Sequence, residues 1–148
     1  MSILNYKLID ILVVEDNPGD ALLIREVLKS NKIYNTLNIV KDGEEAMDFL
    51  YRKGKFAEAP QPDLILLDLN LPKMDGRQVL AKIKSDDKLK QIPVVIMTMS
   101  QAEEDILKSY KLHANCYVTK PINLDQFVKV VESIEDFWFS LVKLPPKG

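Results

Sequence analysis

The stretch "LILLDLNLPKMDG", residues 64–76, decides how the chain is interpreted. Its first four residues, Leu64–Leu67, are large and apolar, which is typical of a strand buried on both faces of a parallel sheet. Asp68 follows at once, and the residues after it are rich in Asn, Pro, Asp and Gly, which favour turns. The question is whether Asp68 only ends the strand or carries chemistry at its end.

The rest of the chain repeats this arrangement. Further apolar runs rich in branched residues predict strands at residues 8–14, 36–40, 92–97 and 116–118, the second being the weakest. Segments with apolar residues at helical spacing follow each run. Polar pairs at the expected helix starts predict caps: Asn17 with Asp20, Asp42 with Glu45, Ser100 with Glu103, and Asn123 with Gln126. We therefore expect an α/β fold with a doubly wound, five-stranded parallel sheet covered on both faces.

The last helix is expected to be unusually long, from about Leu124 to Val142. Its end, "DFWFSLVKLPP", is apolar on nearly every side. These side chains either bury themselves on the domain's own surface or form a partner interface. We favour the interface and expect a homodimer through this C-terminal region.

Composition excludes several function classes. The net charge is −2 and no long Lys or Arg run is present, so a nucleic-acid surface is not indicated. The N-terminus lacks the features of a signal peptide, and no apolar run is long enough for a membrane span. Cys116 is the only cysteine, which excludes an intrachain disulfide. We expect a cytoplasmic protein.

Polar side chains follow several predicted strands at the point where each strand ends. They are Glu15 and Asp16, Asp68, Thr98 and Lys120. The carboxyl ends of parallel strands meet at one edge of the sheet, which is where ligands bind in open α/β sheets. Two carboxylates about 4 Å apart repel each other by roughly 4 kcal/mol at an effective dielectric constant of about 20. A divalent cation with oxygen ligands, such as Mg²⁺, relieves this repulsion.

Each of these residues also has an ordinary interpretation. A single acid at a strand end is most often a turn or cap residue, and a single lysine is most often a solvated charge. Their convergence from four segments on one edge makes a common site the better explanation.

Four blocks in the chain resemble the signature blocks of two-component response-regulator receiver domains of the CheY-like type, in order and in spacing. They are "VVEDNP" (13–18), "LLDLNLPKMDG" (66–76), "VVIMTMS" (94–100) and "YVTKP" (117–121). The resemblance covers residues 8–136, so residues 137–148 are expected to be an extension of the last helix and a short tail, without an output domain. It implies a flavodoxin-like (βα)5 fold with strand order 2-1-3-4-5.

Three longer stretches, residues 14–24, 100–121 and 127–145, further resemble the small stand-alone regulators that pair with cyanobacterial phytochromes. This closer resemblance implies a sensor histidine kinase, of phytochrome type, as the partner. It also supports the homodimer expected from the apolar C-terminal region.

The resemblance implies a role for each strand-end residue. Asp68 is implied as the phosphoacceptor, which attacks the phosphohistidine of the partner kinase and becomes an acyl phosphate. Mg²⁺ is implied to bind Asp16, Asp68 and the backbone carbonyl of Asn70, with Glu15 acting largely through water. Lys120 is implied to pair with the phosphoryl oxygens.

A switch is implied as well. Thr98 is implied to move toward a phosphoryl oxygen and vacate space for the ring of Tyr117, which changes the surface around the fourth helix, the fifth strand and the fifth helix. The resemblance also implies a cis peptide between Lys120 and Pro121. Met99 departs from the family pattern, since many members carry a small residue there, and its long side chain is expected to narrow access to the phosphoryl site.

Three alternatives stay open. A degenerate receiver that only scaffolds partners is the nearest, and Met99 favours it. A haloacid-dehalogenase-like phosphatase also uses an aspartate after a strand, but it needs a second acid where this chain has Asn70. A flavodoxin-like cofactor binder shares the topology, but its phosphate loop should be rich in small hydroxyl residues, whereas the "EDNPGD" segment (15–20) repels phosphate unless a metal intervenes. We therefore expect a phosphoacceptor signalling protein that is not a conventional enzyme.

Overall fold

The computed structural model describes residues 9–29, 35–99, 102 and 116–133. The strands are β1 (Ile9–Val14), β2 (Asn35–Val40), β3 (Leu64–Asp68), β4 (Val94–Thr98) and β5 (Cys116–Thr119). The helices are α1 (Pro18–Leu28), α2 (Gly43–Leu50), the short 3₁₀ helix η2 (Gly54–Phe56), α3 (Gly76–Ser85) and α5 (Leu124–Ser133).

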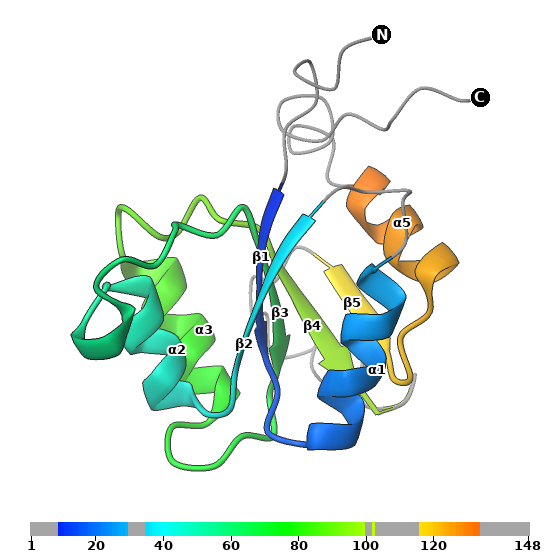
Figure 1. Cartoon of the computed structure of the whole chain (residues 1–148), viewed down its shortest axis with the longest axis horizontal. Coiled ribbons are helices and arrows are strands. Elements are labelled where there is room, and N and C mark those ends of the chain that lie inside the picture. Colours follow the sequence, from blue (N-terminus) through cyan, green and yellow to red (C-terminus); the bar gives the residue numbers. More distant parts are fainter. Residues whose placement is uncertain (1–8, 30–34, 100–101, 103–115, 134–148) are drawn as a thin grey trace, which may run out of the picture.

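The five strands form one parallel sheet with the order β2-β1-β3-β4-β5. This confirms the fold class and the strand order expected for the chain. All the strand arrows in Figure 1 point to the same edge of the sheet. The residues after the strands therefore share that edge, which we call the carboxyl edge.

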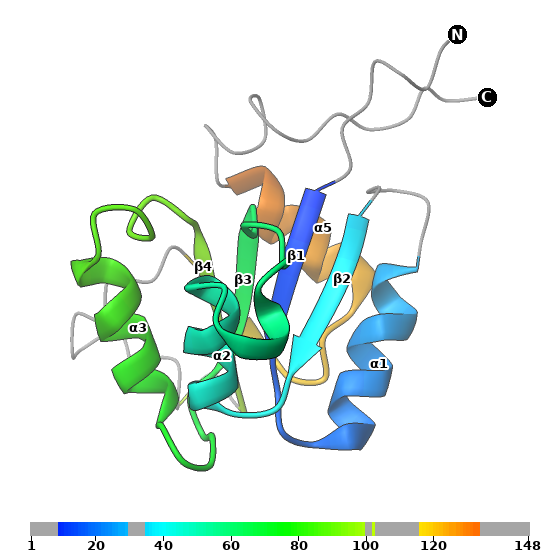
Figure 2. The same ribbon diagram turned by 60° about the vertical axis from the view of Figure 1, so that its left-hand side comes forward.

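Helices cover both faces of the sheet, as Figures 1 and 2 show. The pair α2 and α3 lies on one face, and the pair α1 and α5 lies on the other. Residues along each strand alternate between the two resulting cores. In β1, Leu12 and Val14 belong to the core under α2 and α3, whereas Ile11 and Val13 belong to the core with α1 and α5.

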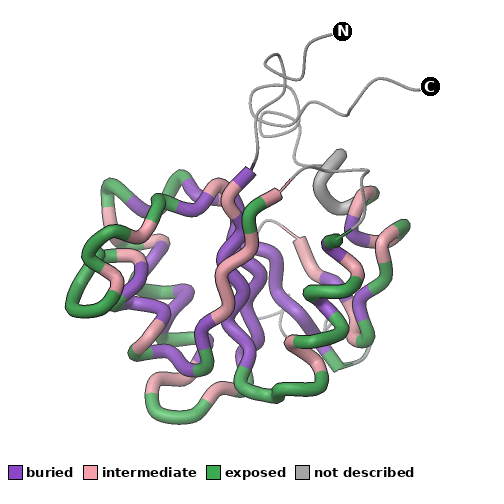
Figure 3. The backbone as a smooth tube through the Cα atoms, viewed as in Figure 1, coloured by how far each residue is buried: buried purple, intermediate pink, exposed green. Residues whose placement is uncertain are grey.

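The central strands are buried almost completely. Every residue of β3 and of β4 is buried, and the tube in Figure 3 is purple along the middle of the sheet. The edge strand β2 is buried only at Val40, which explains why its sequence signal is the weakest. A rigid central strand thus ends at Asp68.

One predicted strand is displaced along the chain. The sequence predicts a strand over residues 92–97, but β4 comprises Val94–Thr98. The backbone N–H of Ile92 donates to the carbonyl of Leu89 in a turn, and Pro93 contributes only its carbonyl oxygen, to Ile65. Proline lacks a donor, so regular pairing begins after it.

Three predicted helix caps are confirmed. Asn17 accepts from the N–H of Asp20 at 2.9 Å, and Asp42 accepts from the N–H of Glu45 at 2.8 Å. Asn123 accepts from the N–H of Gln126 at 2.8 Å. The caps fix where α1, α2 and α5 begin relative to the carboxyl edge.

Several expectations lie outside the described residues. The cap of Ser100 with Glu103 and most of the fourth helix are among them, and α5 is described only to Ser133. The predicted continuation of that helix to Val142 and the tail 137–148 also fall outside. Within the described part of the chain, no helix has the length and apolar character needed to cross a bilayer.

Gly76, the first residue of α3, lies directly against the end of β3. A Cβ atom there would overlap the carbonyl oxygen of Asp68 and would lie 2.5 Å from the Cα of Leu69. Both are backbone atoms that cannot move without displacing the strand end. The loop from Asp68 to α3 therefore depends on the missing side chain of Gly76.

We predict that Gly76→Ala lowers the free energy of unfolding by about 2 kcal/mol, because overpacking costs about 1–3 kcal/mol. Urea denaturation measures the change. The matched control is Gly19→Ala in α1, whose added methyl would meet only the side-chain oxygen of Asn17, at 3.2 Å. The control is expected to change the free energy by less than about 1 kcal/mol. Equal stability of the two variants would contradict the close approach at Gly76.

Candidate functional site

The carboxyl edge gathers side chains from three strand ends. Glu15 and Asp16 follow β1, Asp68 is the last residue of β3, and Lys120 follows β5. The backbone N–H of Glu15 donates to the carbonyl of Val40 at 3.0 Å, which extends the β1–β2 pairing by one residue. The positions of these side chains are therefore set by the sheet itself.

Glu15, Asp16 and Asp68 form an acidic cluster. One carboxylate oxygen from each lies within 4.8 Å of the other two. Glu15 and Asp68 are buried, whereas Asp16 is exposed, so the cluster opens to solvent on one side. Crowded carboxylate oxygens that keep access to water suit Mg²⁺, a hard cation that retains several water ligands. The donor set thus fits the metal that the sequence indicated.

Lys120 is the positive charge at the cluster. Its Nζ lies 2.6 Å from Oε1 of Glu15 and 2.7 Å from Oδ2 of Asp68. Burial by itself lowers the pKa of Lys120, but the hydrogen bonds and negative charges of Asp68 and Glu15 outweigh it and raise the pKa above its ordinary value. Lys120 therefore stays protonated and offsets part of the repulsion between the two acids.

Asp68 is held by both of its carboxylate oxygens. Oδ1 accepts from the backbone N–H of Asn70 at 2.9 Å, and Oδ2 accepts from Nζ of Lys120 at 2.7 Å. Asn70 itself is exposed and lies in the loop between β3 and α3. The carboxylate is therefore fixed in one orientation at the mouth of the cluster.

Glu15 differs from Asp68 in its surroundings. Burial raises the pKa of Glu15 above its ordinary value, although the hydrogen bonds from Lys120 and from the backbone N–H of Asn17 act in the opposite direction. The N–H of Asn17 donates to Oε2 of Glu15 at 3.1 Å. Glu15 is thus the acid of the cluster most removed from water.

Thr98 lies on β4, which pairs with the strand of Asp68, and Tyr117 lies on β5, on the other side of β4. Thr98 follows Met97, the β4 residue opposite Asp68 in the pairing register, and is fully buried. Its hydroxyl donates to the carbonyl of Val118 over 3.4 Å, a long and weak contact. Tyr117 is half-buried in β5 and packs against the core under α2 and α3.

Two features lie next to these residues, and the narrowing of access expected from Met99 stays a prediction. The peptide between Lys120 and Pro121 is cis, as the resemblance implied. Met99, which departs from the family pattern, is 63% exposed. Its side chain is therefore directed largely to solvent.

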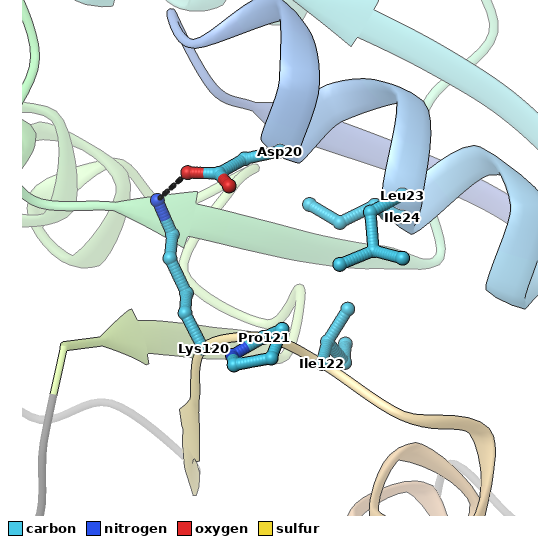
Figure 4. A pocket seen from close by; sticks show the side chains of 6 residues that line it. All are labelled: Asp20, Leu23, Ile24, Lys120, Pro121 and Ile122. Carbon is cyan, nitrogen blue, oxygen red and sulfur yellow. Dashed lines mark hydrogen bonds and ion pairs between the residues drawn. The ribbon is translucent and has the colours of Figure 1, made fainter.

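Asp20 is a site residue that the sequence did not reveal. It was expected only as an acid in the first turn of α1, but its Oδ2 lies 3.3 Å from Nζ of Lys120. Figure 4 shows the two side chains pointing toward each other, from α1 and from the segment after β5. The one available signal was its position in the first turn of α1, the helix that begins shortly after Glu15 and Asp16.

Comparisons with known proteins show the family of the chain. The profile of the response regulator receiver domain family matches residues 11–132. The response regulator Rcp1 of Synechocystis sp. is 53% identical over 135 residues, which cover 91% of this chain and 92% of Rcp1.

Two solved structures are similar over nearly their whole length. The phosphorylated cyanobacterial phytochrome response regulator RcpA is 52% identical, with a TM-score of 0.73 and coverage of 94% of this chain and 99% of RcpA. The Mn²⁺-bound form of Rcp1 is 51% identical, with a TM-score of 0.71 and coverage of 93% and 99%. With its parallel sheet and its acidic cluster at the carboxyl edge, the chain belongs to the response regulator receiver domain family.

Proposed function

We propose that this response regulator accepts a phosphoryl group on Asp68 from the phosphohistidine of a partner histidine kinase, with Mg²⁺ as the cofactor. The observation that supports it most directly is the position of Asp68, between an acidic cluster and a lysine at the carboxyl edge. The family is one of signalling proteins rather than conventional enzymes. The acceptor is accordingly consumed by one transfer and must be regenerated by hydrolysis.

The transfer exchanges one bond to phosphorus for another. An oxygen of the Asp68 carboxylate attacks phosphorus, and the P–N bond to the kinase histidine breaks with its electron pair left on the imidazole nitrogen. The contacts of Asp68 with Asn70 and Lys120 hold the carboxylate in place for this attack. Lys120 then pairs with an oxygen of the phosphoryl group.

The metal site is proposed on the oxygen donors of the cluster. Asp16, Asp68 and the backbone carbonyl of Asn70 are the proposed ligands, and Glu15 is proposed to act through a bound water. The cation would supply positive charge against the phosphoryl oxygens during transfer. The similarity to Rcp1, whose solved structure is a Mn²⁺-bound form, supports a divalent cation here.

The switch is proposed on Thr98 and Tyr117. The weak hydrogen bond from Thr98 to Val118 can be exchanged for a stronger one to a phosphoryl oxygen. Tyr117 can then turn inward, which alters the face formed by the fourth helix, β5 and α5. This face is the proposed output surface.

The proposed partner follows from the chemistry of the acceptor site and from the similarity to known response regulators. A phosphohistidine of a sensor kinase is the proposed donor, and the similarity to RcpA, a phytochrome response regulator, favours a kinase of phytochrome type. A homodimer through the C-terminal region and a cytoplasmic location complete the proposal. Scaffolding by an unphosphorylated receiver is the alternative that the first experiment tests.

We predict that acetyl phosphate with Mg²⁺ adds one hydroxylamine-labile phosphoryl group to the protein, because hydroxylamine cleaves acyl phosphates. Intact-mass spectrometry before and after hydroxylamine measures it. Asp68→Ala is expected to abolish the addition.

The matched control is Asp87→Asn, which removes a carboxylate whose side chain is 94% exposed and contacts only a surface lysine among the ion pairs described. It is expected to leave the phosphorylation unchanged. A folded wild-type protein that never takes up the group would favour the scaffold, and a group retained in Asp68→Ala would place the acceptor elsewhere.

We predict that Asp16→Asn weakens Mg²⁺ binding more than about tenfold, since it removes one of the few charged ligands of a hard cation. Isothermal titration calorimetry measures the dissociation constant. Asp87→Asn again serves as the control, with an unchanged constant. Equal affinity of the Asp16→Asn and wild-type proteins would remove Asp16 from the metal site.

A further inference from the structure

Three carboxylates surround the ammonium group of Lys120. A lysine offers three N–H donors, and Nζ of Lys120 lies 2.6 Å from Glu15, 2.7 Å from Asp68 and 3.3 Å from Asp20. The contacts with Asp68 and Asp20 are hydrogen bonds and the contact with Glu15 is a close ion pair, so a phosphoryl oxygen that arrives at Lys120 competes with these carboxylates.

Asp20 is the partner most easily displaced. Its contact is the longest of the three, and its side chain is 43% exposed, compared with 8% for Asp68 and 0% for Glu15. An exposed carboxylate that loses its partner is solvated by water, whereas a buried one is left unpaired at a large cost in free energy. Asp20 thus occupies the one position at Lys120 that is exchangeable with solvent.

A small cavity lies beside the pair. Leu23, Ile24, Pro121 and Ile122 line a cavity of about 10 Å³ beside it, which has room for about one water molecule (Figure 4). The cavity is too small for an organic ligand. The Asp20–Lys120 contact is consequently a structural element of the phosphoryl site and not a separate binding pocket.

Asp20 also has an ordinary role as an acid in the first turn of α1, where it interacts favourably with the helix dipole. That role needs only a negative charge near the helix start. It does not require the side chain to point at Lys120, as it does in Figure 4.

We propose that Asp20 is a positioning residue that competes with the incoming phosphoryl group for Lys120 and so restrains the phosphorylation of Asp68. This rests on the proposed function. Asp20 slows phosphorylation in two ways. It occupies a donor of Lys120, and its negative charge repels the phosphoryl oxygens. Its removal therefore accelerates transfer.

The test follows the rate at which Asp68 is phosphorylated in Asp20→Asn, measured by intact mass over time with saturating Mg²⁺. With acetyl phosphate, the Asp68 carboxylate forms the new O–P bond, and the bond between phosphorus and the acetyl oxygen breaks with its electron pair on acetate. With phosphoramidate, the P–N bond breaks and neutral ammonia leaves. Neither transfer needs another reactant.

We predict that Asp20→Asn raises the rate with acetyl phosphate about three- to tenfold, which is the size expected for one partly exposed charge near the reacting group. Asp20→Glu restores the charge and is expected to stay within about twofold of the wild type. The acceleration is expected to be smaller with phosphoramidate, which carries one negative charge fewer. A merely structural role of Asp20 would not depend on the charge of the donor.

The matched control is Glu26→Gln, which removes the same charge from the same helix but interrupts only a surface pair with Lys29 at 3.2 Å. It is expected to leave the rate within about twofold of the wild type. A wild-type protein that is phosphorylated, with Asp20→Asn no faster than Glu26→Gln, would overturn this inference alone. A wild-type protein that takes up no phosphoryl group would overturn the proposed function, and this inference with it.

Discussion

The structure depends on a balance of charge at one edge of its sheet. Glu15, Asp16 and Asp68 bring three carboxylates together within 4.8 Å, and Lys120 is the cation that contacts two of them. Repulsion of roughly 4 kcal/mol for each close pair, at an effective dielectric constant of about 20, is large beside a total stability of about 5–15 kcal/mol. One lysine offsets only part of it. The fixed arrangement of the carboxylates therefore favours the binding of additional positive charge.

The fold can hold such a site because the strands that carry it are rigid. β3 is buried along its whole length and ends at Asp68, and Gly76 lets the following helix return against that end. The segment after β5 brings Lys120 to the same edge, and its backbone N–H donates to the carbonyl of Thr98 at 2.7 Å. Asp68 is thereby linked through Lys120 to Thr98, the last residue of the neighbouring strand β4.

Much of this arrangement follows from patterns that a sequence displays. Runs of branched apolar residues, polar caps and the recurrence of polar residues after strands predicted the parallel sheet and the gathering of Glu15, Asp16, Asp68 and Lys120 at one edge. Such patterns act over a few residues, so they mark strands and helix starts well. The start of β4 was wrong by two residues because the donor-less Pro93 delays regular pairing.

Contacts between distant segments of the chain could not be predicted from the sequence. Asp20 and Lys120 are 100 residues apart, and the periodicity of a helix fixes the face of a side chain but not the atom that it reaches. The overlap that a Cβ atom at Gly76 would cause likewise depends on how closely α3 returns to β3. The apolar pattern of α1 also does not distinguish the buried Ile24 from its neighbour Leu23, which is 40% exposed.

A crystal structure of the protein with Mg²⁺ and beryllofluoride, an analogue of a bound phosphoryl group, tests the proposed chemistry most directly. We expect beryllium bonded to an oxygen of Asp68, the metal held by Asp16, Asp68 and the carbonyl of Asn70, and Nζ of Lys120 within about 3 Å of a fluorine atom. Beryllofluoride bound at another residue, or a metal bound away from the acidic cluster, would contradict it.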